Sequence, residues 1–402
     1  MRKLILSFTL VALTTVAFGQ KKVVRSAERS LKKGDYQEAL TDIDAALEDA
    51  ETGEDPNTHM VKGKIKTMMF SSDESNDNST VATGREAYAA FERAMQLDGN
   101  DRNSKIGKEI YKDVLPGMPE NLQGEGLMRL KASSMDKAIE RYEDDDMDLA
   151  HAFFALAADI DPADTSIVFN AGYTANMIEN HEAAKKYFTQ LIEDEEYNKL
   201  NAYYFLIQIA SGTDQDQDEA YRLVNEARAV YPEDKGLQEF EIQLLLQLEK
   251  MDEALASIEK ALEEDPNDNA IRLRYGYLKE QSGDLEGALE EYKKTVETDP
   301  EFFEGNYYTG AIYLDRARGI ITEVNNLADD EWEKKSEGLL KEADDLYKNS
   351  VPYFTKASEL KPENTEILEI LFQIHTRLDN KDKAEEYNQR LQALLGPDWM
   401  EG

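Results

Sequence analysis

The four histidines are the side chains best suited to acid–base chemistry or metal binding near neutral pH. His59, His151, His181 and His375 are far apart in the sequence, and no two of them have the spacing of a metal-binding pair. Each also falls within a helical pattern of apolar residues. Histidines in such positions usually pack or face solvent, so the sequence predicts neither a metal centre nor a histidine base.

Acidic residues gather at three places where they could bind a divalent cation. Residues 214–218 (DQDQD) resemble the start of an EF-hand loop, but Glu219 and Asn225 stand where that loop needs glycine and glutamate. The runs at 144–146 and 265–268 fall at expected turns or helix starts, where a carboxylate is favoured by the helix N-terminus. We therefore interpret all three as solvated turns.

Other signs of catalysis are also missing from the sequence. No phosphate-binding or dinucleotide-binding glycine loop, nucleophile elbow or HExxH motif occurs. With no cysteine, the chain has no disulfide, zinc thiolate site or thiol nucleophile, and a lipid anchor on cysteine is excluded. The sequence predicts a protein without catalytic activity, cofactor or metal. An acidic-site hydrolase remains an alternative, because a carboxylate pair cannot be placed across a cleft from sequence alone.

The charge balance limits the kinds of partner. The 402 residues include 46 basic and 83 acidic ones, for a net charge of −37. Such a field repels nucleic-acid phosphates and anionic lipid head groups. It favours protein or peptide partners with basic character, although an acidic surface can also serve solubility alone.

The N-terminus has the pattern of a secretory signal peptide. Arg2 and Lys3 precede an apolar run of about 15 residues, and small residues at Ala17 and Gly19 precede a predicted cut. The run is short for a transmembrane span; an uncleaved anchor or a buried helix is the alternative. We predict a signal peptide over residues 1–19 and a periplasmic or secreted protein that is not a lipoprotein.

A sequence pattern recurs along the chain with a period of roughly 34 residues, which is within the range of known repeat architectures. It pairs alanines with an apolar or aromatic residue at helical spacing and ends near a proline, as in Ala254, Ile258 and Ala261 before Pro266. Further copies include Ala39/Ile43/Ala46, Ala87/Phe91/Ala94, Ala150/Phe154/Ala157, Ala184/Phe188/Leu191, Ala220/Val224/Ala227 and Ala288/Tyr292/Thr295. Pro232, Pro266 and Pro300 are evenly spaced, and their interval sets the period of the pattern.

With this period the chain resembles the tetratricopeptide repeat family over about residues 22–396. The resemblance implies an all-α superhelical solenoid of helix pairs. Glycines at 63, 172, 276 and 310 match the small residue of the first helix, which lets the two helices of a unit approach closely. The register near residues 200 and 235 is not clear from the sequence.

Three stretches break the period and suggest the domain organisation. Residues 71–83 are polar and predict a mobile loop between two lengthened helices. Residues 100–147 predict helical segments at about 106–114 and 122–142, separated by prolines. Residues 315–347 predict an inserted helical hairpin. We expect N-terminal repeat-like units at 20–118 and a main array at 119–402.

The family resemblance implies that the first helices line a concave groove for a partner segment. The groove candidates with a clear register are Phe169, Tyr173, Asn176, Leu273, Tyr277, Glu280, Tyr307 and Ala311. Trp332 on the predicted hairpin is a further docking candidate. These residues lack the basic set that clamps a terminal carboxylate in chaperone-binding members. The alternative is that several groove candidates seal the core between repeats, and that Trp332 packs the hairpin against its neighbour.

Together these features predict a non-catalytic protein-interaction scaffold of the cell envelope. A self-assembling structural subunit of an envelope complex is the alternative, and the hydrolase comes after it.

Overall fold

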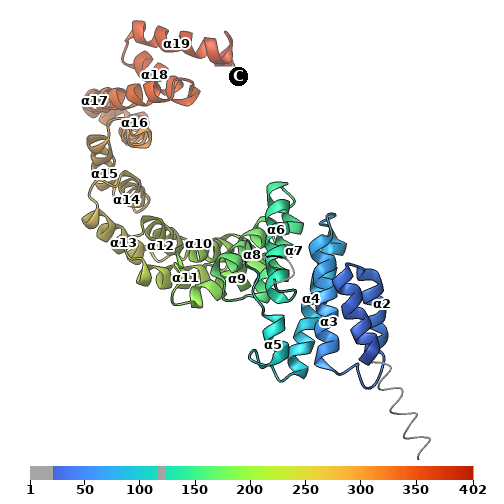
Figure 1. Cartoon of the computed structure of the whole chain (residues 1–402). Coiled ribbons are helices and arrows are strands. Elements are labelled where there is room, and N and C mark those ends of the chain that lie inside the picture. The colour runs from blue at the N-terminus through green and yellow to red at the C-terminus, as the bar shows by residue number, and fades with distance from the viewer. Residues whose placement is uncertain (1–20, 116, 118, 120–122, 402) are drawn as a thin grey trace, which may run out of the picture. The chain divides into compact units, whose positions relative to one another are not determined.

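The computed structural model describes residues 21–115, 117, 119 and 123–401. The predicted signal peptide at 1–19 lies outside them. The described residues form helices and connecting turns, without strands. The all-α prediction is therefore confirmed, and consecutive helices pack as pairs joined by short turns (Figure 1). In the described part of the chain, every helix is too short or too polar to cross a bilayer.

The chain divides into two compact units, residues 1–223 and 224–402. The first described helix of unit 1 covers residues 21–33. The helices that follow are α2 (Tyr36–Leu47), α3 (Pro56–Ser72), α4 (Asn78–Leu97), α5 (Lys105–Ile110), α6 (Leu127–Glu143), α7 (Met147–Ile160), α8 (Thr165–Met177), α9 (His181–Glu193), α10 (Leu200–Gln208) and the π-helix η2 (Ile209–Thr213). The packed pairs include α3 with α4, α6 with α7, and α8 with α9.

The boundary between the units falls within α11 (Gln217–Val230). The remaining helices are α12 (Lys235–Gln247), α13 (Met251–Glu264), α14 (Asn269–Gln281), α15 (Leu285–Thr298), α16 (Phe303–Asn325), α17 (Asp329–Leu360), α18 (Thr365–Arg377), α19 (Lys381–Leu395) and the 3₁₀-helix η3 (Trp399–Glu401). The predicted hairpin at 315–347 falls within α16 and α17, whose lengths of 23 and 32 residues exceed those of the other pairs in unit 2.

Short polar residues begin most of the helices. Side chains of Asp146 and Asp268 accept hydrogen bonds from the backbone N–H groups of Leu149 and Ile271, at 3.2 and 3.0 Å. Such caps satisfy N–H groups that lack a partner in the first turn. Equivalent caps come from Asp55, Asp77, Asp164, Asn180, Asp234, Asp284, Asn364 and Asn380. The prediction that the acidic clusters at 144–146 and 265–268 mark helix starts is confirmed.

Glycine against an aromatic ring is the recurring contact inside the helix pairs. In four pairs, a Cβ atom on the glycine of the first helix would come within 2.5–3.0 Å of a ring on the second helix. These pairs are Gly63 with Phe91, Gly172 with Phe188, Gly276 with Tyr292 and Gly310 with Phe354. Real Cβ atoms do not come as close as at Gly63 and Gly276, and they rarely come as close as at Gly172 and Gly310, so the predicted packing role of these glycines is confirmed.

The helix starts also explain the irregular register near residue 200. The second helices α7, α9, α11, α13 and α15 begin at Met147, His181, Gln217, Met251 and Leu285. The interval from the start of α9 to the start of α11 is two positions longer than the others, which are equal. One additional residue lies in the connection from α9 to α10. The other lies between α10 and α11, where the π-helix η2 accommodates it, since a π-turn holds one residue more than an α-turn.

The predicted loop at 71–83 is wrong in its extent. Only residues 73–77 lie outside helices, because a capping box between Asp77 and Thr80 starts α4 within the polar stretch. The Lys137 ammonium donates to the Asp73 carbonyl at 2.6 Å and to the Asn76 amide oxygen at 2.5 Å. These bonds from α6 hold the short turn in place.

The segment 100–147 contains less helix than its apolar spacing suggests. The first helix ends at Ile110 instead of continuing to residue 114, and the second begins at Leu127 rather than 122. Gly126 lies so close to the Ile110 carbonyl that a Cβ atom would not fit, so the chain runs against α5 before it turns into α6. The expected domain boundary at 118 stays a prediction; α3 and α4 contact α6 across it within unit 1.

Candidate functional site

An apolar pocket opens between α6 and α8 in unit 1, with α7 behind it. Its volume is about 360 Å³. The lining residues, which we call the aromatic pocket, are Ile139, Tyr142, Phe154, Phe169, Asn170, Tyr173 and Thr174. Ile139 and Tyr142 are 45% and 41% exposed, although a soluble helix normally buries such residues when it can. The pocket therefore offers apolar surface to solvent.

A group of aromatic rings fixes the shape of this pocket. Phe169 and Tyr173 lie one turn apart on α8, and their rings are nearly parallel with centroids 6.4 Å apart. Phe205 of α10 contacts both rings edge-on at 6.1 and 6.0 Å and stacks on Phe188 of α9 at 4.7 Å. Because each ring is supported by another, Phe169 and Tyr173 are held in position before any partner binds.

The polar groups of the pocket are few. Hydrogen bonding with Tyr142 raises the pKa of the Tyr173 hydroxyl above its usual value. The Thr174 hydroxyl donates to the Asn170 carbonyl at 2.7 Å, so it is already satisfied within its helix. Behind α8, His151 makes a 3.1 Å hydrogen bond to the Ala171 carbonyl, and burial lowers its pKa. An apolar lining with a few oriented polar groups suits an apolar side chain better than a reacting substrate.

Acidic residues border the pocket where α6 and α8 end. Asp145 lies in the turn from α6 to α7, Asp148 lies in the first turn of α7, and Glu179 lies in the turn after α8. We call these three exposed carboxylates the acidic rim; together with Met177 they line a second, open hollow. Met177 is one turn beyond Tyr173 on α8, so the hollow continues the aromatic pocket along that helix.

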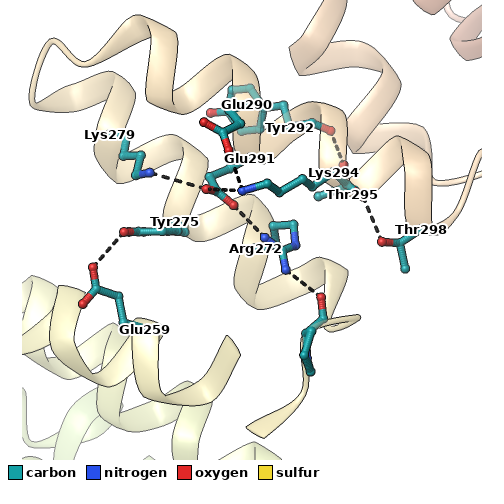
Figure 2. Close-up of polar contacts among 11 residues, drawn as sticks. Glu259, Arg272, Tyr275, Lys279, Glu290, Glu291, Tyr292, Lys294, Thr295 and Thr298 are labelled. Carbon is teal, nitrogen blue, oxygen red and sulfur yellow. Dashed lines mark hydrogen bonds and ion pairs between the residues drawn. The ribbon is translucent and has the colours of Figure 1, made fainter. Parts of the chain in front are cut away.

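Unit 2 contains a different kind of polar centre. The Glu291 carboxylate on α15 is 4% exposed and lies among three cations, as Figure 2 shows. Its oxygens are 2.7 Å from Arg272, 3.4 Å from Lys279 and 3.2 Å from Lys294. Arg272 also donates to the Pro266 carbonyl at 2.6 Å. We call this group the Glu291 cluster; it ties α14 to α15 and to the turn before α14.

The helix pairs around the Glu291 cluster match a known repeat family in sequence. A tetratricopeptide repeat family model matches residues 245–307, which run from the end of α12 to the start of α16. Over these residues the chain carries tetratricopeptide repeat sequence. No curated protein matches it in sequence.

Solved structures of tetratricopeptide repeat proteins are similar to the chain. The C-terminal part of a repeat protein from Cytophaga hutchinsonii is 14% identical, with a TM-score of 0.45, and the match covers 65% of this chain and 95% of that one. A repeat protein from Bacteroides fragilis is 18% identical, with a TM-score of 0.31, covering 61% and 98%. YrrB, described as having an unusual peptide-binding site, is 19% identical, with a TM-score of 0.36, covering 44% and 90%.

The predicted groove residues of these repeats have different surroundings in the two units. Phe169 and Tyr173 line the aromatic pocket, whereas Asn176 is half-buried on the same helix and is not part of the pocket lining. Ile139 and Tyr142, which complete the pocket, are absent from the sequence-based set. Their helix α6 does not follow the repeated pattern, so the sequence does not indicate which face of α6 is exposed.

In unit 2, most groove candidates take part in the core. Leu273 packs against a cluster that includes Tyr292, and Glu280 accepts a 2.9 Å hydrogen bond from the Tyr292 hydroxyl. The Tyr307 hydroxyl donates to the Glu366 carboxylate at 2.8 Å, and the Tyr307 ring packs on Phe354. Ala311 packs against the hydrophobic cluster that contains Phe354. The contacts of Leu273, Tyr307 and Ala311 support a role in packing, and Glu280 bonds the second helix of its own pair.

Two sequence candidates in unit 2 keep a large exposed surface. Tyr277 and Trp332 are each 50% exposed. Trp332 lies in the first turn of α17, so it is part of the hairpin formed with α16. Its exposure agrees with the docking interpretation more closely than with packing against a neighbour. The role of both side chains in binding stays a prediction.

The residues considered for metal binding have structural partners. Asp214 pairs with Lys185 at 3.1 Å, and Asp216 accepts a hydrogen bond from the Glu219 N–H group at the start of α11. His59 bonds the Gly53 carbonyl at 2.8 Å, and His375 stacks on Tyr387. Among the described residues, no cluster of three or more acidic or histidine side chains is arranged to hold a metal ion.

Proposed function

We propose that this chain is a non-catalytic scaffold that holds a segment of another protein in the aromatic pocket of unit 1. The observation that carries the proposal is the pair of exposed side chains, Ile139 and Tyr142, facing the supported rings of Phe169 and Tyr173. Leaving this surface in water costs free energy, and a partner's apolar side chain would remove it from water.

The pocket also has the properties of a binding hot spot. Its tyrosines present large, rigid faces with a polar tip, and such residues carry much of the binding energy at protein interfaces. The Glu291 carboxylate, by contrast, is neutralised by three cations instead of facing a second carboxylate. That arrangement gives the hydrolase alternative no support.

Binding can be tested by photo-crosslinking the full chain in cells of a bacterial host. A photoreactive residue in place of Asn170 should crosslink to a protein segment, and Tyr173→Ala should reduce that yield roughly tenfold or more, as at other aromatic hot spots. Ile139→Lys, which places a charge at an exposed helical position, should reduce it similarly without loss of folding. Mass spectrometry of the crosslinked peptide identifies the partner.

A matched control is Met251→Ala, which removes an exposed apolar side chain of unit 2 that lies outside the pocket. It should leave the crosslinking yield unchanged. Equal yields from all variants would contradict binding in the pocket. Crosslinks only to other copies of this chain would instead support the self-assembly alternative.

We further propose that the scaffold acts outside the cytoplasm, in the cell envelope or after secretion. The support is the basic residues, apolar run and small residues of the first 19 positions. When the full chain is expressed in a bacterial host, the protein recovered from the exported fraction should have Gln20 as its first residue. A Leu10→Arg variant, which interrupts the apolar run, should stay in the cytoplasm at full length.

The matched change Thr14→Ser keeps the polarity of that position and should leave export unchanged. Recovery of uncleaved wild-type chain from the cytoplasm would contradict the export proposal. N-terminal sequencing of the recovered protein measures the cut directly.

A further inference from the structure

The aromatic pocket and the acidic rim are neighbours on unit 1, where α6 and α8 end. Tyr142 lines the pocket three residues before Asp145, in the last turn of α6. On α8, Tyr173 lines the pocket while Met177, one turn further, lines the acidic hollow. A bound segment that fills the pocket and follows α8 toward its end must therefore pass the three carboxylates of the rim.

The rim carries negative charge that the protein leaves exposed. Asp146 is engaged as the cap of α7, and Asp144 pairs with Arg141 at 3.3 Å, so neither is counted in the rim. Asp145, Asp148 and Glu179 are exposed; the first two lie at the start of α7, and Glu179 lies in the turn after α8. Like charges gathered at one place repel each other, and a cation placed among them relieves that repulsion.

We propose that the occupant of this surface is a protein segment in which an apolar or aromatic anchor is followed closely by lysine or arginine. The anchor enters the aromatic pocket, and the basic side chains lie against the acidic rim. This inference rests on the proposed function, since it names the chemistry of the partner at the same site. It follows from the charge of the rim and its position beside the pocket, and it gives the site a preference that the apolar lining alone lacks.

The preference can be measured with three pools of 12-residue peptides and the labelled full chain. All pools carry randomised apolar or aromatic residues at the centre, and their flanking positions are fixed as basic, neutral or acidic. At low salt, the basic pool should retain about tenfold more protein than the acidic pool, as two or three exposed ion pairs would give. The ratio should shrink at 0.5 M salt, because exposed charges are screened.

The variant for this test neutralises the rim with Asp145→Asn, Asp148→Asn and Glu179→Gln together. It should bring the basic and acidic pools to within about twofold of each other while keeping pocket-dependent binding. The matched control neutralises three exposed carboxylates of unit 2 at Glu253, Glu263 and Glu286, and it should leave the preference intact. Circular dichroism confirms that both triple variants remain folded.

The results separate the inference from the function on which it rests. Binding that depends on Ile139 but is equal for the three pools, or a preference that survives neutralisation of the rim, would overturn the inference and leave the pocket proposal standing. If no pool binds the wild-type chain more strongly than it binds the Ile139→Lys variant, both the inference and the pocket proposal are overturned for this class of segment.

Discussion

A Glu291→Gln substitution should lower the free energy of unfolding by about 3 kcal/mol, the lower end of the range for breaking a buried ion pair. The carboxylate is 4% exposed and accepts from Arg272, whose side chain is itself only 11% exposed. Without the negative charge, the Arg272 guanidinium stays buried without a counter-charge. The glutamine oxygen can still accept one hydrogen bond, which limits the loss.

The neighbouring Glu290 is the matched control for this prediction. It pairs with the same Lys294 at 2.8 Å, but its side chain is 66% exposed. Glu290→Gln should produce no measurable change, because an exposed pair between residues four apart contributes little. Urea unfolding measures the difference, and amide exchange should show faster opening of α14 and α15 in Glu291→Gln. Equal behaviour of the two variants would mean that the Glu291 cluster does not stabilise the repeat.

Much of the fold is visible in the sequence because each repeat is a local unit. The spacing of Pro232, Pro266 and Pro300 gives the period, and the same aspartate caps and glycine contacts recur in successive pairs. Helix starts and close contacts of this kind depend on residues within one pair, so no long-range information is needed. The errors fall at 71–83 and 100–126, where the period is interrupted and the chain has its own arrangement.

Only half of the candidate site could be predicted from the sequence, because only some of its residues lie on helices that follow the repeat. Phe169 and Tyr173 lie on a helix that follows the repeat, and the family pattern places them on the inner face. Ile139 and Tyr142 lie on α6, whose partner helices cannot be read from a repeated pattern. Their exposure is decided by how α6 packs on α7, α3 and α4, which is tertiary information.

Charge in the core is the part of the structure that sequence reasoning missed most completely. Glu290 and Glu291 are adjacent and identical in type, yet one faces solvent and the other is buried. The helical period separates their faces, and Ala288 and Tyr292 mark the buried side. What the period cannot show is that Arg272, on the preceding helix, reaches the same point.

A Gly276→Ala substitution should lower the free energy of unfolding by about 2 kcal/mol, which is typical of an overpacked core. The new Cβ atom would lie 2.5 Å from Cε1 and 2.7 Å from Cδ1 of Tyr292. That ring is fully buried, and its hydroxyl donates to Glu280 at 2.9 Å, so the ring cannot move away without losing a hydrogen bond. The helix pair α14 and α15 must therefore separate slightly.

The control for this prediction is a glycine-to-alanine substitution that should stabilise the protein instead of destabilising it. Gly319 lies within α16, and a Cβ atom there would meet nothing within 4 Å. Gly319→Ala should raise the free energy of unfolding by roughly 0.5–1 kcal/mol, because alanine restricts the unfolded chain and favours helix. Gly310→Ala, where the nearest Phe354 ring atom would be 3.0 Å away, should cost less than Gly276→Ala.

The double variant Gly276→Ala with Tyr292→Leu then tests whether the clash with the ring is the cause. Tyr292→Leu alone should be destabilising, since it removes a buried ring and leaves a cavity. In that background the alanine methyl group has room, so adding Gly276→Ala should cost little or nothing. A double-mutant cycle measures this coupling from urea unfolding. If the two losses simply add, the alanine acts through the backbone instead, and the close approach of α14 to α15 is not what requires glycine at this position.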